Sequence, residues 1–404
     1  MEQDVNPSLS EYISTIEISI QNNRNERDKL LFVRIEKSRQ VHSLRNNTFV
    51  RKGNSTVRIG GNELVRLYQE RGVALFEDEV SNLNTLNDDI DIDLLHRYMK
   101  DTGSREKDDE QFLKNHTFLV SKDGTFYFTK SFILLFGKNP FLLLKSKCNI
   151  KISHYYGNEI TYSGEPNLKE KPFSIYGSLL SQIEQAVDYF RKSVRRSPIK
   201  LEGATFKSKL LIPEWVFQEA ITNAVIHRSY FEQRDIQVRF FDNRIEIESP
   251  GAYPGHITSQ NIQQEQFARN PVIQDSLNKF ANSPNVDIGE GVNRMFKVMA
   301  SHNLYEPYYV SESHNKHSVV VVLFNLLKTR HWDTISEYLD KYGRIKSQDA
   351  RRITGINDSN EMKREFDRWM TSGLIIRRGK KRGAYYIKND DNRLGYITKI
   401  ASKK

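Results

Sequence analysis

The sequence predicts a multidomain α/β protein, and three observations support this prediction. The chain has 404 residues, which is longer than one ordinary hydrophobic core accommodates. Segments with the strand-like alternation of apolar and polar residues are interspersed with segments whose apolar residues recur at helical spacing. After Lys328 the pattern changes to short helices and one hairpin, which indicates a separate C-terminal unit.

The first predicted unit covers residues 1–75 and is expected to be α+β. Ser14–Ile20 and Lys29–Lys37 alternate apolar and polar residues and therefore predict two strands. Thr48–Arg51 is a further extended piece, and Asn62–Arg71 has a helical pattern.

The second predicted unit, residues 76–171, is a connecting α/β segment that ends in a linker. The Asp123-Gly124 pair is typical of a tight hairpin. Lys130–Phe136 is strongly apolar and stops at a glycine, as many helices do. Gly157–Ser174 is rich in Pro, Gly and Lys, which indicates a linker.

The third predicted unit, residues 172–328, mixes helices with strands. A proline in the first turn suits a helix start, so one helix is expected to open at Pro213. The other expected helices are Ser178–Val194 and Val292–Ala300, and the expected strands are Leu201–Leu211, Ile236–Phe241, Arg244–Ser249 and Val319–Leu323.

The fourth predicted unit, residues 329–404, contains short helices followed by a hairpin with a basic tip. This order of elements is a winged-helix pattern. The expected helices are His331–Tyr342, Ser347–Ile353 and Ser359–Thr371, and the expected strands are Leu374–Arg378 and Gly383–Lys388.

The net charge of +10 is concentrated at one end of the chain. From Leu374 to Lys404 there are ten Lys and Arg residues against two acidic ones, a net charge of +8. Clustered positive charge gains affinity for a phosphate backbone because bound counterions are released. A solvated tail that aids solubility is the alternative interpretation.

Several classes of protein are not expected. The single cysteine, Cys148, excludes an internal disulfide and a cysteine-based zinc cluster. Met1–Ser10 is polar and acidic, unlike a secretory signal, and the apolar stretches are too short to cross a bilayer. The sequence therefore predicts a cytoplasmic protein without a membrane partner.

Three polar residues are spaced by four on the helix that opens at Pro213. Glu219, Asn223 and His227 therefore lie along one face. An asparagine oxygen is a hard ligand that suits Mg²⁺, and a glutamate one turn away can orient or deprotonate a water. His227-Arg228 can hydrogen-bond phosphate or order a loop. An ordinary solvated helix face is the alternative interpretation.

Two glycine-containing turns follow in the sequence. Ser249–Gly251 comes directly after a predicted strand, where glycine lets the backbone approach a ligand. Gly289–Gly291 precedes a predicted helix, whose N-terminus offers free N–H groups to phosphate. Short Pro/Gly turns are common, so each turn alone is weak evidence.

The order of these motifs is more specific than any one of them. E-x-x-x-N-x-x-x-H-R-x-Y, then S-P-G, then R-N-P, then G-E-G-V-x-R-M closely resembles the GHKL (Bergerat) ATPase-like domain of RecG-like transcriptional regulators. The resemblance implies a GHKL α/β sandwich over about Pro172–Leu327, with ATP and Mg²⁺ as cofactors. Glu219 would be the catalytic, water-activating carboxylate, and Asn223 the metal ligand.

The same resemblance implies the rest of the nucleotide site. Thr258–Asp287 would be the nucleotide lid. Ser249 stands where the wider family has an aspartate that reads the adenine amino group. Besides Asn223, the implied cofactor-binding residues are His227, Arg228, Ser249, Gly251, Arg269, Asn270, Gly289, Gly291 and Arg294.

Phe49–Thr56 resembles the end of a Schlafen/AlbA-type DNA-binding domain. Arg51 and Lys52 beside a glycine turn would bind phosphate, although a solvated β-turn is an equal alternative. The resemblance implies that the upstream half of this domain is missing from the chain. Schlafen-type nuclease activity needs metal-binding carboxylates from that half and is therefore not expected.

The winged helix carries its own basic residues. A helix-turn-helix would present Arg351, Arg352, Lys363 and Arg364 to a groove of DNA. Arg377, Arg378, Lys380, Lys381 and Arg382 would form a basic wing. A protein–protein or dimer module is the alternative interpretation.

The leading functional hypothesis is an ATP·Mg-binding, DNA-binding transcriptional regulator in which nucleotide occupancy biases nucleic-acid binding. RNA is a second candidate nucleic acid, and the family resemblance suggests a homodimer. The alternatives are a slow ATPase in a phage-defence or DNA-processing system, and a DNA-binding protein with a degenerate nucleotide pocket.

Overall fold

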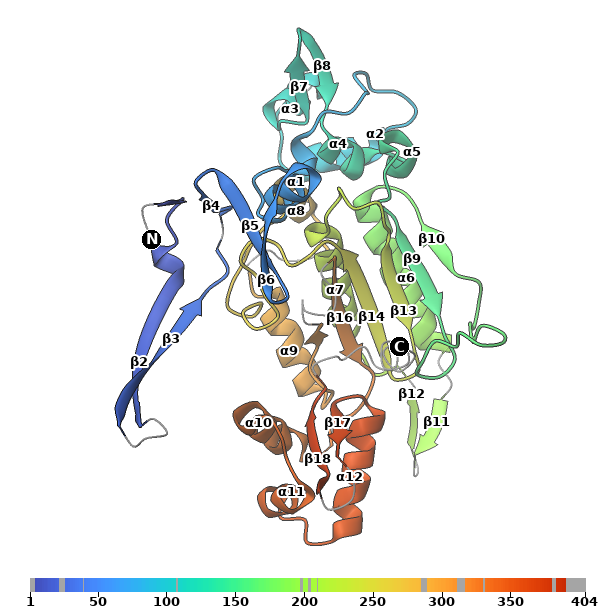
Figure 1. The fold of residues 1–404 in the computed structure, drawn as a ribbon. Helices are drawn as coiled ribbons and strands as arrows, with labels where there is room; N and C mark the ends of the chain where they lie inside the picture. Colours follow the sequence, from blue (N-terminus) through green and yellow to red (C-terminus); the bar gives the residue numbers. More distant parts are fainter. Residues whose placement is uncertain are drawn as a thin grey trace.

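A computed structural model shows a molecule built around one central sheet (Figure 1). The structure describes residues 4–21, 26–38, 40–106, 108–196, 199–202, 205–208, 210–284, 289–310, 317–329, 331–379 and 383–389. Side chains of residues 195–209 are not described.

The central sheet has six strands in the order β10-β9-β13-β14-β16-β15. Strands β9 and β13 are parallel, and all other neighbours are antiparallel. The strands are β9 (Ile150–His154), β10 (Phe173–Ile175), β13 (Ile236–Phe240), β14 (Arg244–Pro250), β15 (Tyr308–Tyr309) and β16 (Ser318–Phe324).

Helices α6 (Leu179–Arg196) and α7 (Glu214–His227) pack on this sheet, and α9 (Gly291–Ser301) packs against α7. Helix α7 contacts α6, α9 and strand β14, so it is the most enclosed of these helices. Alternate strand residues such as Val238, Ile247 and Leu323 join the helices in the main hydrophobic core. This placement holds the polar residues of α7 against the sheet.

The N-terminal unit contains a four-stranded sheet in the order β1-β4-β5-β6 and a separate hairpin, β2–β3. The predicted strands and helix of this unit are present. Their bounds are β1 (Val5–Asn6), β2 (Ile13–Gln21), β3 (Arg27–Ile35), β4 (Ser43–Leu44), β5 (Asn47–Lys52), β6 (Ser55–Ile59), α1 (Gly61–Glu70) and the 3-10 helix η2 (Ser10–Tyr12).

The connecting segment forms a helical layer at the top of Figure 1. Its core is aromatic, with Tyr98, Phe118 and Phe136 in mutual ring contact. Its elements are η3 (Phe76–Asp78), α2 (Ile92–Asp101), α3 (Asp109–Asn115), β7 (Leu119–Lys122), β8 (Thr125–Phe128), α4 (Lys130–Phe136) and α5 (Pro140–Leu144), and α8 (Pro271–Asn278) packs against α4.

The C-terminal unit has the predicted helices and hairpin. They are α10 (Trp332–Tyr342), α11 (Ser347–Thr354), α12 (Ser359–Thr371), β17 (Ile375–Arg378) and β18 (Tyr385–Lys388). Trp332 and Trp369 lie in a second hydrophobic core, which also includes Val322 and Phe324 of β16. The C-terminal unit is therefore packed on the face of β16 opposite the main core.

One predicted element is wrong. The expected single strand over Leu201–Leu211 is instead a hairpin of β11 (Ile199–Glu202) and β12 (Thr205–Ser208). Alternation of apolar and polar residues does not distinguish one strand from two short paired ones. Pro213 also stands one residue before the first helical residue of α7, as its N-cap. In the described part of the chain, no helix has the length and apolar character needed to cross a bilayer.

Candidate functional site

A cavity of about 590 Å³ lies between α7, the sheet and the segment that follows β14. Glu219, Asn223 and His227 of α7 all line it, as the four-residue spacing predicts. The lining also includes Ser249 at the end of β14 and both Gly289 and Gly291 of the second glycine turn. Six of the predicted site residues, from three separated segments, therefore share one cavity.

Glu219 and Asn223 are joined by a hydrogen bond. The amide Nδ2 of Asn223 donates to Oε1 of Glu219 at 3.0 Å. Glu219 is only 4% exposed, because α7 is enclosed by its neighbours. Since the amide nitrogen is engaged with the carboxylate, the amide oxygen Oδ1 is the atom of Asn223 that suits a metal ion.

Ser249 is tied to the same helix. Its hydroxyl donates to the backbone carbonyl of Ala224 at 2.8 Å, and the side chain is buried. Its oxygen keeps acceptor capacity after this donation. Ile247, Val319 and Val321 provide apolar lining from the sheet beside it.

The first glycine turn is filled by an arginine. Gly251 has φ +102°, and a Cβ there would lie 2.3 Å from Nη1 of Arg269 and 2.7 Å from Cβ of Ser229. Arg269 donates to the backbone carbonyls of His227, at 3.0 Å, and Ala252. Burial lowers the pKa of Arg269 to about 10. Arg269 thus fastens the turn to the end of α7, and neither it nor Gly251 lines the cavity.

Three further predicted residues also lie outside the cavity lining. Arg228 is fully buried and donates to the backbone carbonyls of Lys147 and Arg234, each at 2.8 Å. Asn270 donates to two carbonyls at the end of α7. The guanidinium of Arg294 lies over the ring of Trp215, 4.6 Å from its centroid. Arg228 and Asn270 thus hold the backbone beside the site, whereas Arg294 contacts a ring of α7.

The second glycine turn faces the α7 carboxylate and the predicted lid. Gln266 Nε2 donates to the carbonyl of Gly289 at 3.0 Å. Asn293 Nδ2 donates to the carbonyl of Gln263 at 2.9 Å, so two bonds tie the segment across the cavity to the start of α9. Of the predicted lid, Asn285–Asp287 lies outside the described residues.

The segment across the cavity also contacts the N-terminal unit. The ring of Phe267 lies where a side chain on Gly72 or Gly255 would be, with a Cβ at 2.8 Å and 2.4 Å respectively. Arg71 donates to the carbonyl of Gly255, and the N–H of Gly255 donates to the carbonyl of Glu70. The cavity cover is thus fitted against the end of α1.

Sequence reasoning missed Tyr309 in the cavity lining and the buried Glu77 at the start of α8. Tyr309 lines the cavity, and burial together with the charge of Glu219 raises its pKa. Glu77 is fully buried and accepts the backbone N–H groups of Val272 and Ile273 at the start of α8. Neither residue belongs to a recognisable sequence motif, so their positions become evident only from the tertiary structure.

Among the described residues, no group of three or more His, Cys, Asp or Glu side chains is placed to bind a metal ion. A metal ion at this site would therefore take most of its ligands from water and from a bound phosphate. The single amide oxygen of Asn223 suits a hard cation that is coordinated in this way.

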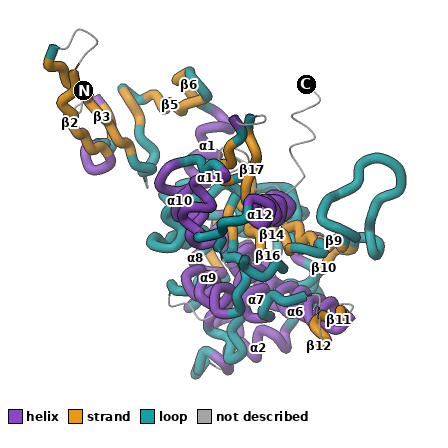
Figure 2. The backbone as a smooth tube through the Cα atoms, turned by 90° about the horizontal axis from the view of Figure 1, so that it is seen from below, coloured by secondary structure: helices purple, strands orange, loops and turns teal. Residues whose placement is uncertain are grey.

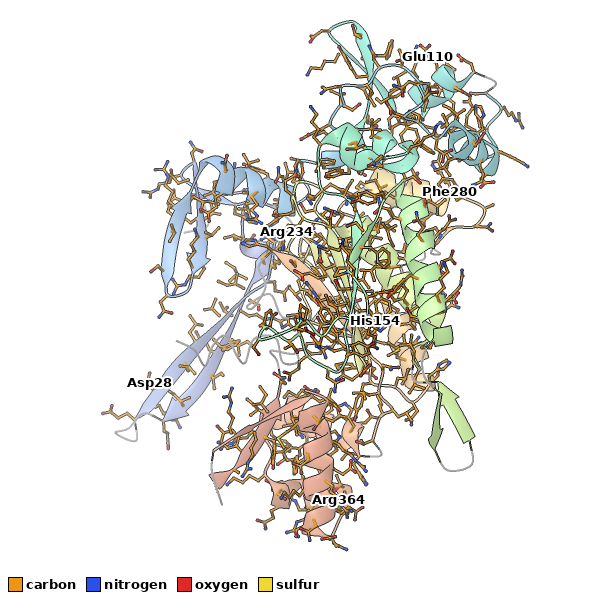
Figure 3. The ribbon with its side chains drawn as sticks, turned by 90° about the vertical axis from the view of Figure 1, so that its right-hand side faces the viewer. Asp28, Glu110, His154, Arg234, Phe280 and Arg364 are labelled. Atoms are coloured by element: carbon orange, nitrogen blue, oxygen red, sulfur yellow. The ribbon has the colours of Figure 1, made fainter. Side chains whose placement is uncertain are left out.

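The predicted nucleic-acid residues lie away from the cavity. Lys52 pairs with Glu63 at 2.6 Å, Arg51 donates to Thr56, and Arg352 pairs with Asp349 at 3.3 Å. Arg351 donates to the carbonyl of Asn357. Lys363, Arg364, Arg377 and Arg378 are exposed, and Figure 3 shows Arg364 at the end of the molecule formed by α10–α12. Lys380, Lys381 and Arg382 lie outside the described residues.

Comparison with known proteins identifies part of the central unit. Residues 233–323 match the family described as "Putative ATP-dependent DNA helicase recG C-terminal". This ATPase-like match begins after α7, so Glu219 and Asn223 lie outside the matched residues. No curated protein matches the chain.

A solved structure is also similar. It is the crystal structure of the DIP2311 protein from Corynebacterium diphtheriae, with 17% identity and a TM-score of 0.47. The alignment covers 94% of this chain and 77% of that one.

Proposed function

We propose that the chain binds ATP·Mg²⁺ in the cavity between α7 and the glycine turns. The observation that carries this proposal is the convergence of Asn223, Ser249, Gly289 and Gly291 on one cavity of about 590 Å³. That volume lies within the range of about 300–1,000 Å³ typical of small-molecule sites. The match to an ATPase-like family over the sheet and the second glycine turn supports the same ligand class.

The cavity offers a distinct environment for each part of a nucleotide. Ile247, Val319 and Val321 provide apolar surface for a base. Because Ser249 donates its proton to Ala224, its oxygen can accept a hydrogen bond from an amino group such as that of adenine. The N-terminus of α9, which begins at Gly291, presents backbone N–H groups and the positive end of the helix dipole to phosphates.

Asn223 would hold the metal through Oδ1, with phosphate and water oxygens completing the coordination. A bound Mg²⁺ neutralises phosphate charge. Within this chain, Glu219 fixes the orientation of the Asn223 amide through the 3.0 Å hydrogen bond. The predicted roles of Arg228, Gly251, Arg269, Asn270 and Arg294 become indirect in this proposal, because each acts through the backbone or a neighbouring ring.

The nucleic-acid partner is proposed to be DNA, bound by the C-terminal unit acting as a winged helix. Exposed Lys363 and Arg364 on α12, with Arg377 and Arg378 on β17, support this role. The same proposal includes two further points. The N-terminal unit is a partial Schlafen/AlbA-type DNA-binding domain, and the protein regulates transcription. The contact of Phe267 with Gly72 offers a physical route by which cavity occupancy would reach the N-terminal unit.

The proposal is tested by calorimetric titration of the full chain with ATP, with and without Mg²⁺, alongside DNA binding over a range of salt concentrations. We expect Mg²⁺-dependent ATP binding and a change in DNA affinity when ATP·Mg²⁺ is present. If ATP binds without changing the affinity for DNA, the nucleotide site is supported, but the proposed effect of ATP on DNA binding is wrong. Absence of ATP binding would leave a DNA-binding protein with a degenerate pocket.

Slow ATP hydrolysis is a second candidate function, and the position of Glu219 favours it. Its carboxylate lies in the cavity beside the second glycine turn, where it can hold or accept a proton from a water. Turnover of labelled ATP by the wild type, absent in Glu219→Gln, would support this activity. Equal turnover in both proteins would exclude Glu219 as the base.

A further inference from the structure

The short segment before α11 adds a third extended piece to the β17–β18 hairpin. Ile345 forms an isolated bridge with Tyr386, and the two residues exchange backbone hydrogen bonds of 2.8 Å in both directions. Strand β18 therefore lies between β17 and this segment. Figure 1 shows β17 and β18 between α10 and α12, and Figure 2, seen from below, shows this C-terminal unit facing the viewer.

One face of this small sheet packs into the second hydrophobic core. Ile345 and Ile375 are buried, and the ring of Tyr386 stacks on Phe366 of α12 with the centroids 3.8 Å apart. Because successive side chains of a strand point to opposite faces, the neighbours of these residues lie on the other face of the sheet.

Six described side chains form that outer face, which we call the cationic sheet face. The register of the hairpin places Arg378 directly opposite Tyr385. On the other side of Tyr385 lies Lys346, one residue from the Ile345 bridge. Three of the six are exposed cations, three are half-buried apolar or aromatic groups, and none is acidic. The cations are Arg344, Lys346 and Arg378, and the centre of the face is formed by Ile376, Tyr385 and Ile387.

The positive charge of this face is not neutralised within the described part of the chain, where none of the three cations takes part in an ion pair. On the neighbouring helix α12, by contrast, Arg368 pairs with Glu365 at 2.6 Å. The guanidinium of Arg344 instead lies over the ring of Tyr385, 5.7 Å from its centroid. The face thus combines available positive charge with a planar aromatic group and a planar cation.

This combination favours an unpaired nucleic-acid strand as the partner. Phosphates gain from the cations through counterion release, and unstacked bases pack on aromatic rings and on guanidinium planes. A duplex keeps its base faces inside, so it would leave the apolar centre uncovered. An acidic peptide would match the charge but offers no series of planar faces. On α12 the exposed cations alternate with exposed Glu361 and Asp367, which makes that helix less suited to a flexible polyanion.

We propose that the cationic sheet face binds a single-stranded segment of nucleic acid. A base stacks against Tyr385 and Arg344, and phosphates lie near Lys346 and Arg378. This inference rests on the proposed nucleic-acid role of the C-terminal unit and adds a second ligand class to it. Helix α12 and the sheet then bind different forms, a duplex and an unpaired strand.

Fluorescence anisotropy with the full chain and labelled oligo(dT) tests this proposal. Wild type should bind the strand. Tyr385→Leu removes the ring but keeps an apolar side chain, and it should lower the affinity about tenfold. Tyr385→Phe keeps the ring and should bind as wild type does. Because each contacted phosphate of a single strand contributes about 0.7 to the slope of log affinity against log salt, Lys346→Ala/Arg378→Ala should reduce that slope by about 1.4.

Two matched controls should leave oligo(dT) binding unchanged. Tyr176→Leu removes an aromatic side chain that is 50% exposed elsewhere, and Lys100→Ala/Lys138→Ala removes two exposed cations of the connecting segment. Oligo(rU) is titrated in parallel, and binding of it that shows the same Tyr385 dependence supports the proposal and extends it to RNA.

Three results overturn the proposal: no binding of oligo(dT) by wild type, equal affinities of wild type and Tyr385→Leu, or a polyglutamate peptide that competes as well as unlabelled oligo(dT). A duplex of the same length separates this inference from the proposed function. Wild type that binds oligo(dT) but no duplex would contradict the role of α12 and leave the sheet as the binding surface. Wild type that binds only the duplex would do the reverse.

Discussion

The carboxylate of Glu219 occupies the space that a side chain on Gly291 would need. A Cβ built on Gly291 would lie 1.8 Å from Oε1 and 2.7 Å from Cδ of Glu219. The acid on α7 and the first residue of α9 are therefore in direct contact, although 72 positions separate Glu219 from Gly291 in the chain. This closeness places the proposed water-activating group beside the proposed phosphate site.

Gly291→Ala should weaken nucleotide binding, because the added methyl group displaces either Glu219 or the start of α9. We expect ATP affinity to fall about tenfold, equivalent to about 1.4 kcal/mol. Gly383→Ala is the matched control, since a Cβ there meets nothing within 4 Å. Calorimetric titration of both variants checks the prediction, and equal affinities would contradict it.

Glu77 should make stability depend on pH. Desolvation raises its pKa from the ordinary value of 4.5 to about 7, despite the N–H groups of Val272 and Ile273 that favour the charged form. Between these two values the folded state binds more protons than the unfolded state, so the free energy of unfolding decreases as pH rises through this window. The size of the effect is about 3 kcal/mol.

Glu77→Gln removes this titration. Urea unfolding of both proteins at pH 5 and pH 8 isolates the contribution of Glu77, since all other groups are shared. Wild type should lose stability relative to the variant between pH 5 and pH 8. Parallel stabilities across that range would show that the carboxyl group titrates normally in the folded chain.

Phe267→Ala should loosen the cover of the cavity, because the ring fills the slot between Gly72 and Gly255. Amide exchange in residues 262–268 is expected to accelerate about tenfold, as local opening becomes easier. Leu142→Ala removes an exposed apolar side chain elsewhere and should leave exchange in this segment unchanged. Unchanged exchange in Phe267→Ala would mean that the ring does not hold the segment closed.

The paired substitution Lys363→Ala/Arg364→Ala should reduce the salt dependence of DNA binding. Each neutralised phosphate contributes about 0.9 to the slope of log affinity against log salt, so the slope should fall by about 2. Lys100→Ala/Lys138→Ala removes two exposed cations from the connecting segment as a control. Fluorescence anisotropy over a salt series gives both slopes, and an equal change in the two variants would remove α12 as the DNA-binding element.

Spacing along a helix predicted which polar side chains of α7 lie together on one face. Glu219, Asn223 and His227 line one cavity because a four-residue interval keeps side chains on one helix face. Motif order also identified Ser249, Gly289 and Gly291 as residues of the same cavity.

The positions of the Arg228 and Arg269 side chains could not be predicted from motif order or helix spacing. The sequence led us to expect Arg228 and Arg269 among the cofactor-binding residues, but in the fold their guanidinium groups donate to backbone carbonyls. Whether a guanidinium meets a ligand or a carbonyl depends on which loop ends lie nearby, and that is set by tertiary packing. The same holds for Glu77, whose partners are 195 and 196 residues further along the chain.

The central claim is most directly tested by calorimetric titration of ATP into wild type and Asn223→Ala, each with Mg²⁺ and with EDTA. If Asn223 holds the metal, the variant should bind ATP at least about tenfold more weakly in Mg²⁺, and the two proteins should bind equally in EDTA. Equal affinity of the two proteins in Mg²⁺ would contradict the account.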